Sequence, residues 1–224
     1  IMSYIVSING SDGSGKTKQI DLLRQNSNKS TFFSPDIAQY GVFPKLPERQ
    51  AFEWWFYNST IEEFCTAVYR GIQYRNEEIE KQNKPIAFID KGLDTFDSRI
   101  LANFLCRGME ESYIMQNMQR IKKKIGICDN EDMKIFLLTN SEIDRRLKIA
   151  KSRKGTSFGQ AYYDRYQRTL NEIIEKQINN GIYKVVDASG SIEQVNNKII
   201  DVIRQGIYDK KQLSKEGVKG ERSY

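Results

Sequence analysis

The feature that most constrains this chain is a glycine-rich octapeptide near its start. Residues 10–17 read Gly-Ser-Asp-Gly-Ser-Gly-Lys-Thr and fit the pattern G-x-x-x-x-G-K-[ST]. An apolar run, residues 4–8, precedes this segment, and a helix-like run, residues 16–24, follows it. Glycines let the backbone turn so tightly that successive N–H groups point at one anion. The strand–loop–helix context therefore predicts a phosphate-binding loop rather than a chance cluster of glycines.

Within this loop, each position has a part in holding a nucleoside triphosphate. The helix that follows the loop adds the positive end of its dipole. We expect Lys16 to reach the β- and γ-phosphates and the Thr17 hydroxyl to bind Mg²⁺. The predicted nucleotide-binding residues of the segment are Gly10, Asp12, Gly13, Ser14, Gly15, Lys16, Thr17 and Lys18. ATP and Mg²⁺ are the expected cofactors.

Composition narrows the remaining chemistry. The chain contains no histidine, which excludes Ser-His-Asp and Cys-His mechanisms and histidine-ligated metals. Its three cysteines lie far apart, which indicates reduced thiols and a cytoplasmic protein, and they are Cys65, Cys106 and Cys128. No apolar run approaches the roughly 20 residues needed to span a membrane. The net charge of +6 comes mostly from scattered basic residues, so it does not indicate a nucleic-acid surface.

Strand-like apolar runs alternate with helical stretches along the chain. The runs are residues 4–8, 31–33, 86–89, 134–138 and 183–186. This alternation predicts an α/β fold, in which a five-stranded parallel sheet lies between two layers of helices. We expect one domain over residues 1–207 and a basic polar tail over 208–224. We also expect a mostly helical region over 48–82, interrupted at 58–60, and a helix that begins at Ser191.

Two carboxylates fall at the edge where a parallel sheet binds its ligands. Asp90 closes the run 86–89, and Asp12 lies in the phosphate loop. We expect both to converge near Mg²⁺ and the transferred phosphoryl group. Asp90 then binds the metal through water or accepts a proton from the acceptor. The alternative for Asp90 is a structural cap of the next segment, and the alternative for the neighbouring Lys91 is an exposed lysine rather than a phosphate contact.

A basic cluster follows the fourth predicted strand, over residues 145–154. Arg146 and Arg153 lie seven residues apart, so they share a face if one helix contains both. Phosphoryl transfer needs cations around the γ-phosphate as negative charge spreads over its oxygens. We therefore predict a lid near residues 148–160, with Arg153 as a catalytic cation and Arg146 as a nucleotide contact. An ordinary solvated helix is the alternative.

Several of these segments resemble the thymidylate kinase and deoxynucleoside kinase group of P-loop nucleotide kinases. Residues 11–19, with their trailing glutamine, are similar to that group's phosphate loop, and residues 89–92 stand in the place of its Asp-Arg motif. Residues 185–190 are similar to its last strand and the loop near adenine, which implies that Ser189 contacts the nucleotide. The resemblance spans most of residues 3–205. It implies ATP-dependent phosphoryl transfer to a nucleoside monophosphate.

The acceptor region departs from the family pattern. Lys91 stands where the family has arginine, and residues 34–36 read Ser-Pro-Asp where Glu-Pro is expected. The resemblance places the acceptor between the second and third strands, where aromatic faces can stack on a base or pack in the core. The candidate acceptor contacts are Phe43, Trp55, Arg70 and Lys91, and Arg49 and Arg75 are the alternatives to Arg70 for an acceptor phosphate or sugar.

The expected partner of this chain is a nucleotide or nucleoside acceptor, with no membrane association and with a homodimer left open. Besides the nucleoside monophosphate kinase, two other activities are compatible with the sequence. A deoxynucleoside kinase or another small-molecule kinase is the first alternative function. A P-loop NTPase switch without kinase activity is the second, although the chain lacks the guanine-specific Asn-Lys-x-Asp motif.

Overall fold

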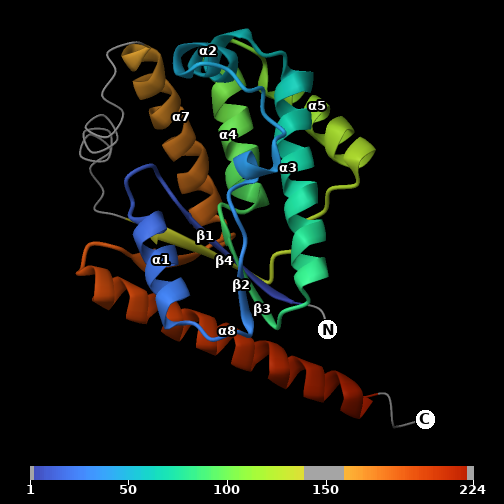
Figure 1. Cartoon of the computed structure of the whole chain (residues 1–224), viewed down its shortest axis with the longest axis vertical. Coiled ribbons are helices and arrows are strands. Elements are labelled where there is room, and N and C mark those ends of the chain that lie inside the picture. Colours follow the sequence, from blue (N-terminus) through green and yellow to red (C-terminus); the bar gives the residue numbers. More distant parts are fainter. Residues whose placement is uncertain (1–2, 139–158, 221–224) are drawn as a thin grey trace.

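The structure is a computed structural model that describes residues 3–138 and 159–220. Five parallel strands form one sheet in the order β2-β3-β1-β4-β5 (Figure 1). The strands are β1 (Tyr4–Gly10), β2 (Thr31–Phe33), β3 (Ile86–Asp90), β4 (Met133–Leu138) and β5 (Lys184–Asp187). Each strand lies within two residues of its predicted bounds. The predicted five-stranded parallel sheet is therefore confirmed.

Strand β1 occupies the centre of the sheet and is buried on both faces. Val6 and Ile8 are fully buried against one layer of helices, while Ile5 faces the other layer. A near-continuous apolar strand of this kind is typical of a parallel sheet that is covered on both sides. The register pairs Ile8 with Asp90 of β3 and Gly10 with Leu137 of β4. The segment after β1 thus leaves from the middle of the carboxyl edge.

Helices α1 (Lys16–Asn26) and α8 (Ile192–Gly220) cover one face of the sheet (Figure 1). Ser191 and Gln194 cap the start of α8 reciprocally, because each side-chain oxygen accepts from the other's backbone N–H. The helix start predicted at Ser191 is confirmed. Helix α8 continues to Gly220, so the expected polar tail from residue 208 begins inside a helix rather than after one.

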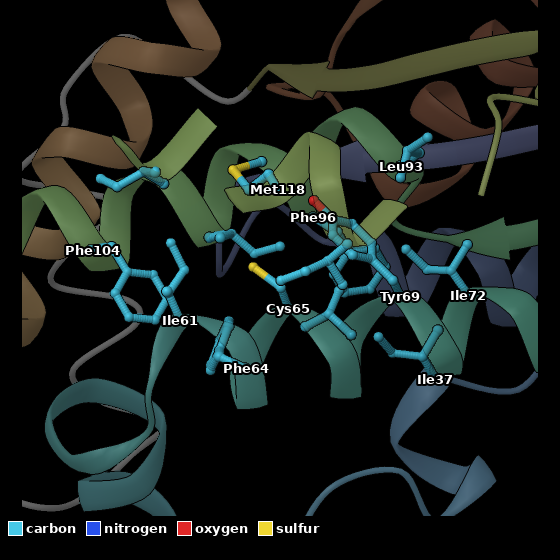
Figure 2. Packing of buried hydrophobic residues seen from close by; sticks show 14 residues of the cluster. Ile37, Ile61, Phe64, Cys65, Tyr69, Ile72, Leu93, Phe96, Phe104 and Met118 are labelled. Carbon is cyan, nitrogen blue, oxygen red and sulfur yellow. The ribbon is translucent and has the colours of Figure 1, made fainter. Parts of the chain in front are cut away.

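Helices α3 (Ile61–Gln82), α4 (Leu93–Cys106) and α7 (Gln160–Asn179) cover the other face (Figure 1). Helix α5 (Glu111–Ile125) packs against α3 and α4. Figure 2 shows the core between these helices, where Cys65 and Tyr69 of α3 face Phe96 of α4 and Met118 of α5. This apolar contact fixes α3 against α4.

The predicted helical region between β2 and β3 is confirmed, and so is its interruption. A short 3₁₀ helix, η1 (Ile37–Tyr40), is followed by α2 (Glu48–Glu53) and the π-helical turn η2 (Trp54–Asn58). The helical conformation ends at Asn58, and Thr60 caps the start of α3 in a reciprocal pair with Glu63.

Among the described residues, no helix is both long and apolar enough to cross a membrane.

Candidate active site

The segment between β1 and α1 has the geometry of a phosphate-binding loop. Gly10 and Gly15 adopt φ angles of 152° and 90°, which side chains rarely tolerate, and a Cβ at Gly10 would clash with the Ser14 hydroxyl. The Ser14 N–H donates to the Ser11 carbonyl and closes the turn. Helix α1 begins at Lys16 without a side-chain cap, so its first N–H groups face the space above the loop. An anion at this position meets backbone donors and the positive end of the helix.

Lys16 lies along the inside of this loop. Its Nζ donates to the carbonyls of Gly10 at 2.8 Å and Ser11 at 2.9 Å, and the residue is 7% exposed. Burial lowers the pKa of Lys16 to about 8, against the opposing effect of the Asp12 carboxylate. The ammonium group is therefore held beside the loop at low dielectric, where an arriving phosphate would stabilise its charge.

Asp12 is tied to two helices behind the loop. One carboxylate oxygen forms an ion pair with Arg99 of α4 at 2.8 Å, and the other accepts from the Tyr163 hydroxyl of α7 at 2.6 Å. Burial lowers the pKa of Arg99, but the Asp12 carboxylate together with Tyr166 and Tyr163 outweighs burial, so the pKa lies above its usual range. Ser11 donates in turn to Asn171 of α7. These contacts favour a role for Asp12 in holding the loop.

Asp90 stands at the carboxyl end of β3, opposite Ile8 in the register. Its Oδ2 accepts from Lys91 Nζ at 3.2 Å, and Lys91 Nζ lies 3.4 Å from Oδ2 of Asp36. Oδ1 of Asp90 is buried and has no hydrogen-bond partner within the described part of the chain. Buried polar atoms in proteins nearly always have a partner, so this oxygen is suited to bind water, a cation or a hydrogen-bond donor of a ligand.

The predicted magnesium contacts suit that ion. Thr17 lies exposed in the first turn of α1 and offers a hydroxyl oxygen, while Asp90 offers a carboxylate. Magnesium binds through one or two protein oxygens and fills its other positions with water and substrate phosphates. Residues 3–138 and 159–220 hold no cluster of three or more Cys, Asp or Glu side chains for a metal. The hydroxyl of Thr17 and the carboxylate of Asp90 are the kind of oxygen ligand that Mg²⁺ takes beside a nucleotide.

The candidate acceptor residues separate into different places. Phe43 and Trp55 lie 5.3 Å apart by ring centroids, and both pack against the core between α3, α4 and α5. Arg70 is exposed and shares with Phe43 an open groove of about 720 Å³ beside α3. Lys91 lies with Asp90 instead. Lys91 therefore lies at the carboxylate site, Phe43 and Arg70 line the same groove, and Trp55 packs against the core.

The remaining predictions around the nucleotide concern Ser189, Lys18, Arg146, Arg153 and the lid. Ser189 follows β5 at the carboxyl edge, where its N–H donates to Asp187 at 3.0 Å. Lys18 is exposed in the first turn of α1. Arg146 and Arg153 lie outside the described residues, as does nearly all of the predicted lid over 148–160. These roles stay predictions.

Sequence reasoning placed Arg75 among the acceptor candidates and missed that Arg75 and Arg99 are buried. Arg75 is 1% exposed, and Arg99 is largely buried beside Asp12. A signal was present for Arg75, because it follows Ile72 by three residues and precedes Ile79 by four on α3. That spacing places it on the buried face, where an arginine must have a specific partner. Only the assembled fold shows that partner, which is the turn after β3.

Comparison with known proteins identifies the fold. No protein-family model matches the chain, and no curated protein matches it by sequence. A solved thymidylate kinase from Candida albicans matches with a TM-score of 0.63 at 15% identity, over 91% of this chain and 92% of that one. The fold is that of the thymidylate and deoxynucleoside kinases.

Two further solved structures support this. A deoxyadenosine kinase from M. mycoides matches with a TM-score of 0.61 at 13% identity, over 90% of this chain and 99% of that one. A thymidylate kinase from Ehrlichia chaffeensis matches with a TM-score of 0.51 at 17% identity, over 91% and 99%. The resemblance read from the loop and from residues 89–92 thus extends to the whole thymidylate kinase-like fold.

Proposed function

We propose that this protein transfers a phosphoryl group from ATP to a nucleoside monophosphate, as thymidylate kinases do. One observation carries the phosphoryl-transfer part of the proposal. Oδ1 of Asp90 is buried and has no hydrogen-bond partner among the described residues, and Asp90 lies on the strand next to the one that leads into the phosphate loop. A phosphate loop accounts for nucleotide binding. A carboxylate at the same sheet edge adds what a kinase needs, a group that orients the attacking oxygen or accepts its proton.

The residues of the chain divide the work of this reaction. The N–H groups of the loop and Lys16 hold the β- and γ-phosphates and stabilise charge in the transition state. Thr17 and, through water, Asp90 would hold Mg²⁺, which would supply positive charge against the phosphates. Asp90 orients the acceptor oxygen, and Arg153 is the proposed source of further positive charge. Asp12 and its partners on α4 and α7 keep the loop in shape.

A second candidate, phosphorylation of a deoxynucleoside or another uncharged small molecule, is favoured by one contact. Lys91 Nζ already lies beside two carboxylates, those of Asp36 and Asp90. A cation so compensated has less charge to offer an acceptor phosphate, whereas the two carboxylates suit a hydroxyl group. The fold is compatible with either acceptor, since its solved relatives include thymidylate kinases and a deoxyadenosine kinase with dCMP bound.

The test is an acceptor screen with ATP and Mg²⁺. Nucleosides and their monophosphates, in both ribose and deoxyribose forms, are offered separately, and ADP and the phosphorylated product are measured together. We expect ADP formation that depends on one acceptor class and is lost in Asp90→Asn. Product from monophosphates supports the first proposal, and product from nucleosides supports the second. ATP hydrolysis at one rate with every acceptor would instead indicate an NTPase switch, and no turnover would overturn both kinase proposals.

A further inference from the structure

The turn between β3 and α4 contains an unusual backbone conformation. Lys91 adopts a φ of 64°, in the left-handed region that residues with a side chain seldom occupy. Such a conformation persists only where neighbouring groups hold it, and it often marks a functional site. Lys91 directly follows Asp90, so whatever holds this residue also orients the proposed reactive carboxylate.

A hydrogen bond from the buried Arg75 is one contact that stabilises this conformation. Arg75 Nη1 donates to the Lys91 carbonyl at 2.8 Å, and the Lys91 N–H donates to the carbonyl of Ile8 at 3.1 Å. Both backbone groups of the residue are thus satisfied while it stays left-handed. The bond from Arg75 comes from a charged donor in a dry environment, where such bonds are stronger than neutral ones.

This position is costly for an arginine. Arg75 is 1% exposed, and its Nε is buried without a hydrogen-bond partner among the described residues. Burial lowers the pKa of its guanidinium, and the Glu131 carboxylate is the strongest opposing influence. A buried charge destabilises a fold unless it makes specific contacts. An apolar residue of similar length would fill the same space on α3 without that cost, so packing does not explain the arginine.

The next two residues are held from other elements. The Gly92 N–H donates to Asn9 Oδ1 at 2.8 Å, and the Leu93 N–H donates to Glu131 Oε1. A Cβ at Gly92 would collide with the Glu131 carboxylate, so only a glycine leaves room for that carboxylate to accept from the Leu93 N–H. Side chains from α3, β1 and the segment before β4 therefore fix three successive backbone positions after Asp90.

We propose that Arg75, with Glu131, is a positioning residue that locks the β3–α4 turn and so aims Asp90 and Lys91 at the acceptor. This inference rests on the proposed kinase function. With the turn locked, Lys91 Nζ stays between Asp90 and Asp36, and Oδ1 of Asp90 is left for the acceptor or for water on the metal. Arg75 acts through the turn and touches no reacting atom.

The experiment compares Arg75→Met with Arg75→Lys and with a control, Lys122→Met. The control also removes a largely buried cation, since Lys122 pairs with Asp97 at 2.7 Å between α5 and α4. A loosened turn misplaces the reacting groups by a fraction of a bond length or more, and we expect kcat to fall about 10²-fold in Arg75→Met. The KM for ATP should hardly change, because the phosphate loop is untouched. Arg75→Lys should recover part of kcat, while Lys122→Met should lower the melting temperature and keep kcat.

A second measurement separates this inference from the proposed function. The crystal structure of Arg75→Met should show Lys91 out of the left-handed region or its Nζ away from Asp90. Unchanged Lys91 geometry, or a full kcat with a lowered melting temperature as in the control, would overturn the inference. If the wild-type protein phosphorylates no acceptor, the proposed function fails, and the crystal structure still decides the role of Arg75. If Arg75→Met does not fold, both the kinetic comparison and the crystal structure are carried out with Arg75→Lys.

Discussion

Arg99 of α4 and Asp12 of the phosphate loop form an ion pair with Nη2 2.8 Å from Oδ1. The two residues are 87 positions apart in the chain, and the second oxygen of Asp12 is held by Tyr163, 151 positions away. The loop is therefore held in shape by α4 and α7 as well as by its glycines. A movement of either helix would displace Asp12 and with it the backbone of the phosphate loop.

We expect Arg99→Leu to lower the free energy of unfolding by about 3–5 kcal/mol, because it leaves the carboxylate of Asp12 largely buried without its cation. Urea unfolding measures the change, and Asp12→Asn in the same chain should restore part of it. The control is Arg24→Leu, which breaks the exposed pair with Asp21 and should cost about 1 kcal/mol or less. Equal losses in both single variants would contradict the buried pair.

Lys16→Ala should abolish phosphoryl transfer while the protein stays folded. Within the described part of the chain, the Lys16 ammonium donates its hydrogen bonds to the loop carbonyls of Gly10 and Ser11, so the core does not depend on it. Loss of a preorganised charge at the transition state is expected to cost about 3–4 kcal/mol of activation free energy. Steady-state kinetics and circular dichroism are measured together. Turnover near the wild-type rate would refute the assignment of the phosphate loop.

The same lysine makes stability depend on pH. Its pKa falls from 10.5 to about 8 on folding, because the folded state buries the ammonium group. Between these values the unfolded chain binds more protons than the native protein, so the free energy of unfolding rises with pH across this window. Urea unfolding at a series of pH values should show the rise in the wild type and a smaller one in Lys16→Met. Identical pH profiles would show that Lys16 titrates normally.

Asp90→Asn nearly preserves shape and removes the charge. We expect kcat to fall by about a hundredfold or more, as for a positioned general base. ATP affinity, measured by calorimetry, should change much less, since the phosphate loop makes most of the nucleotide contacts. Full turnover with the true acceptor would make Asp90 a structural cap of the turn.

Lys91 permits a test of the strained turn. Lys91→Gly and Lys91→Ala both remove the amine from Asp90 and Asp36, but glycine accepts a φ of 64° and alanine does not. We expect Lys91→Gly to be more stable than Lys91→Ala by about 1 kcal/mol. Thermal unfolding of the two variants measures the difference. Equal stabilities would show that the turn is not strained at this residue.

Local patterns in the sequence were enough to predict several parts of this structure. The phosphate loop between residues 10 and 17, the five strands and the break before α3 all depend on neighbouring residues, through glycine conformation, apolar periodicity and capping. Lys122 shows what such patterns leave open. It pairs with Asp97 only because α5 packs on α4, and no neighbouring residue in the sequence indicates that contact.

The sequence by itself thus determined where the phosphate loop lies, since the glycines that allow its tight turn fall within eight consecutive residues. The tertiary structure decided how the groups around that site are paired. It joined Asp12 to Arg99 and Tyr163, brought Arg75 against the Lys91 carbonyl, and gave one oxygen of Asp90 no hydrogen-bond partner within residues 3–138 and 159–220. These pairings connect residues on separate helices and strands. Burial and low dielectric, which arise only when those elements pack together, determine which charges must find partners.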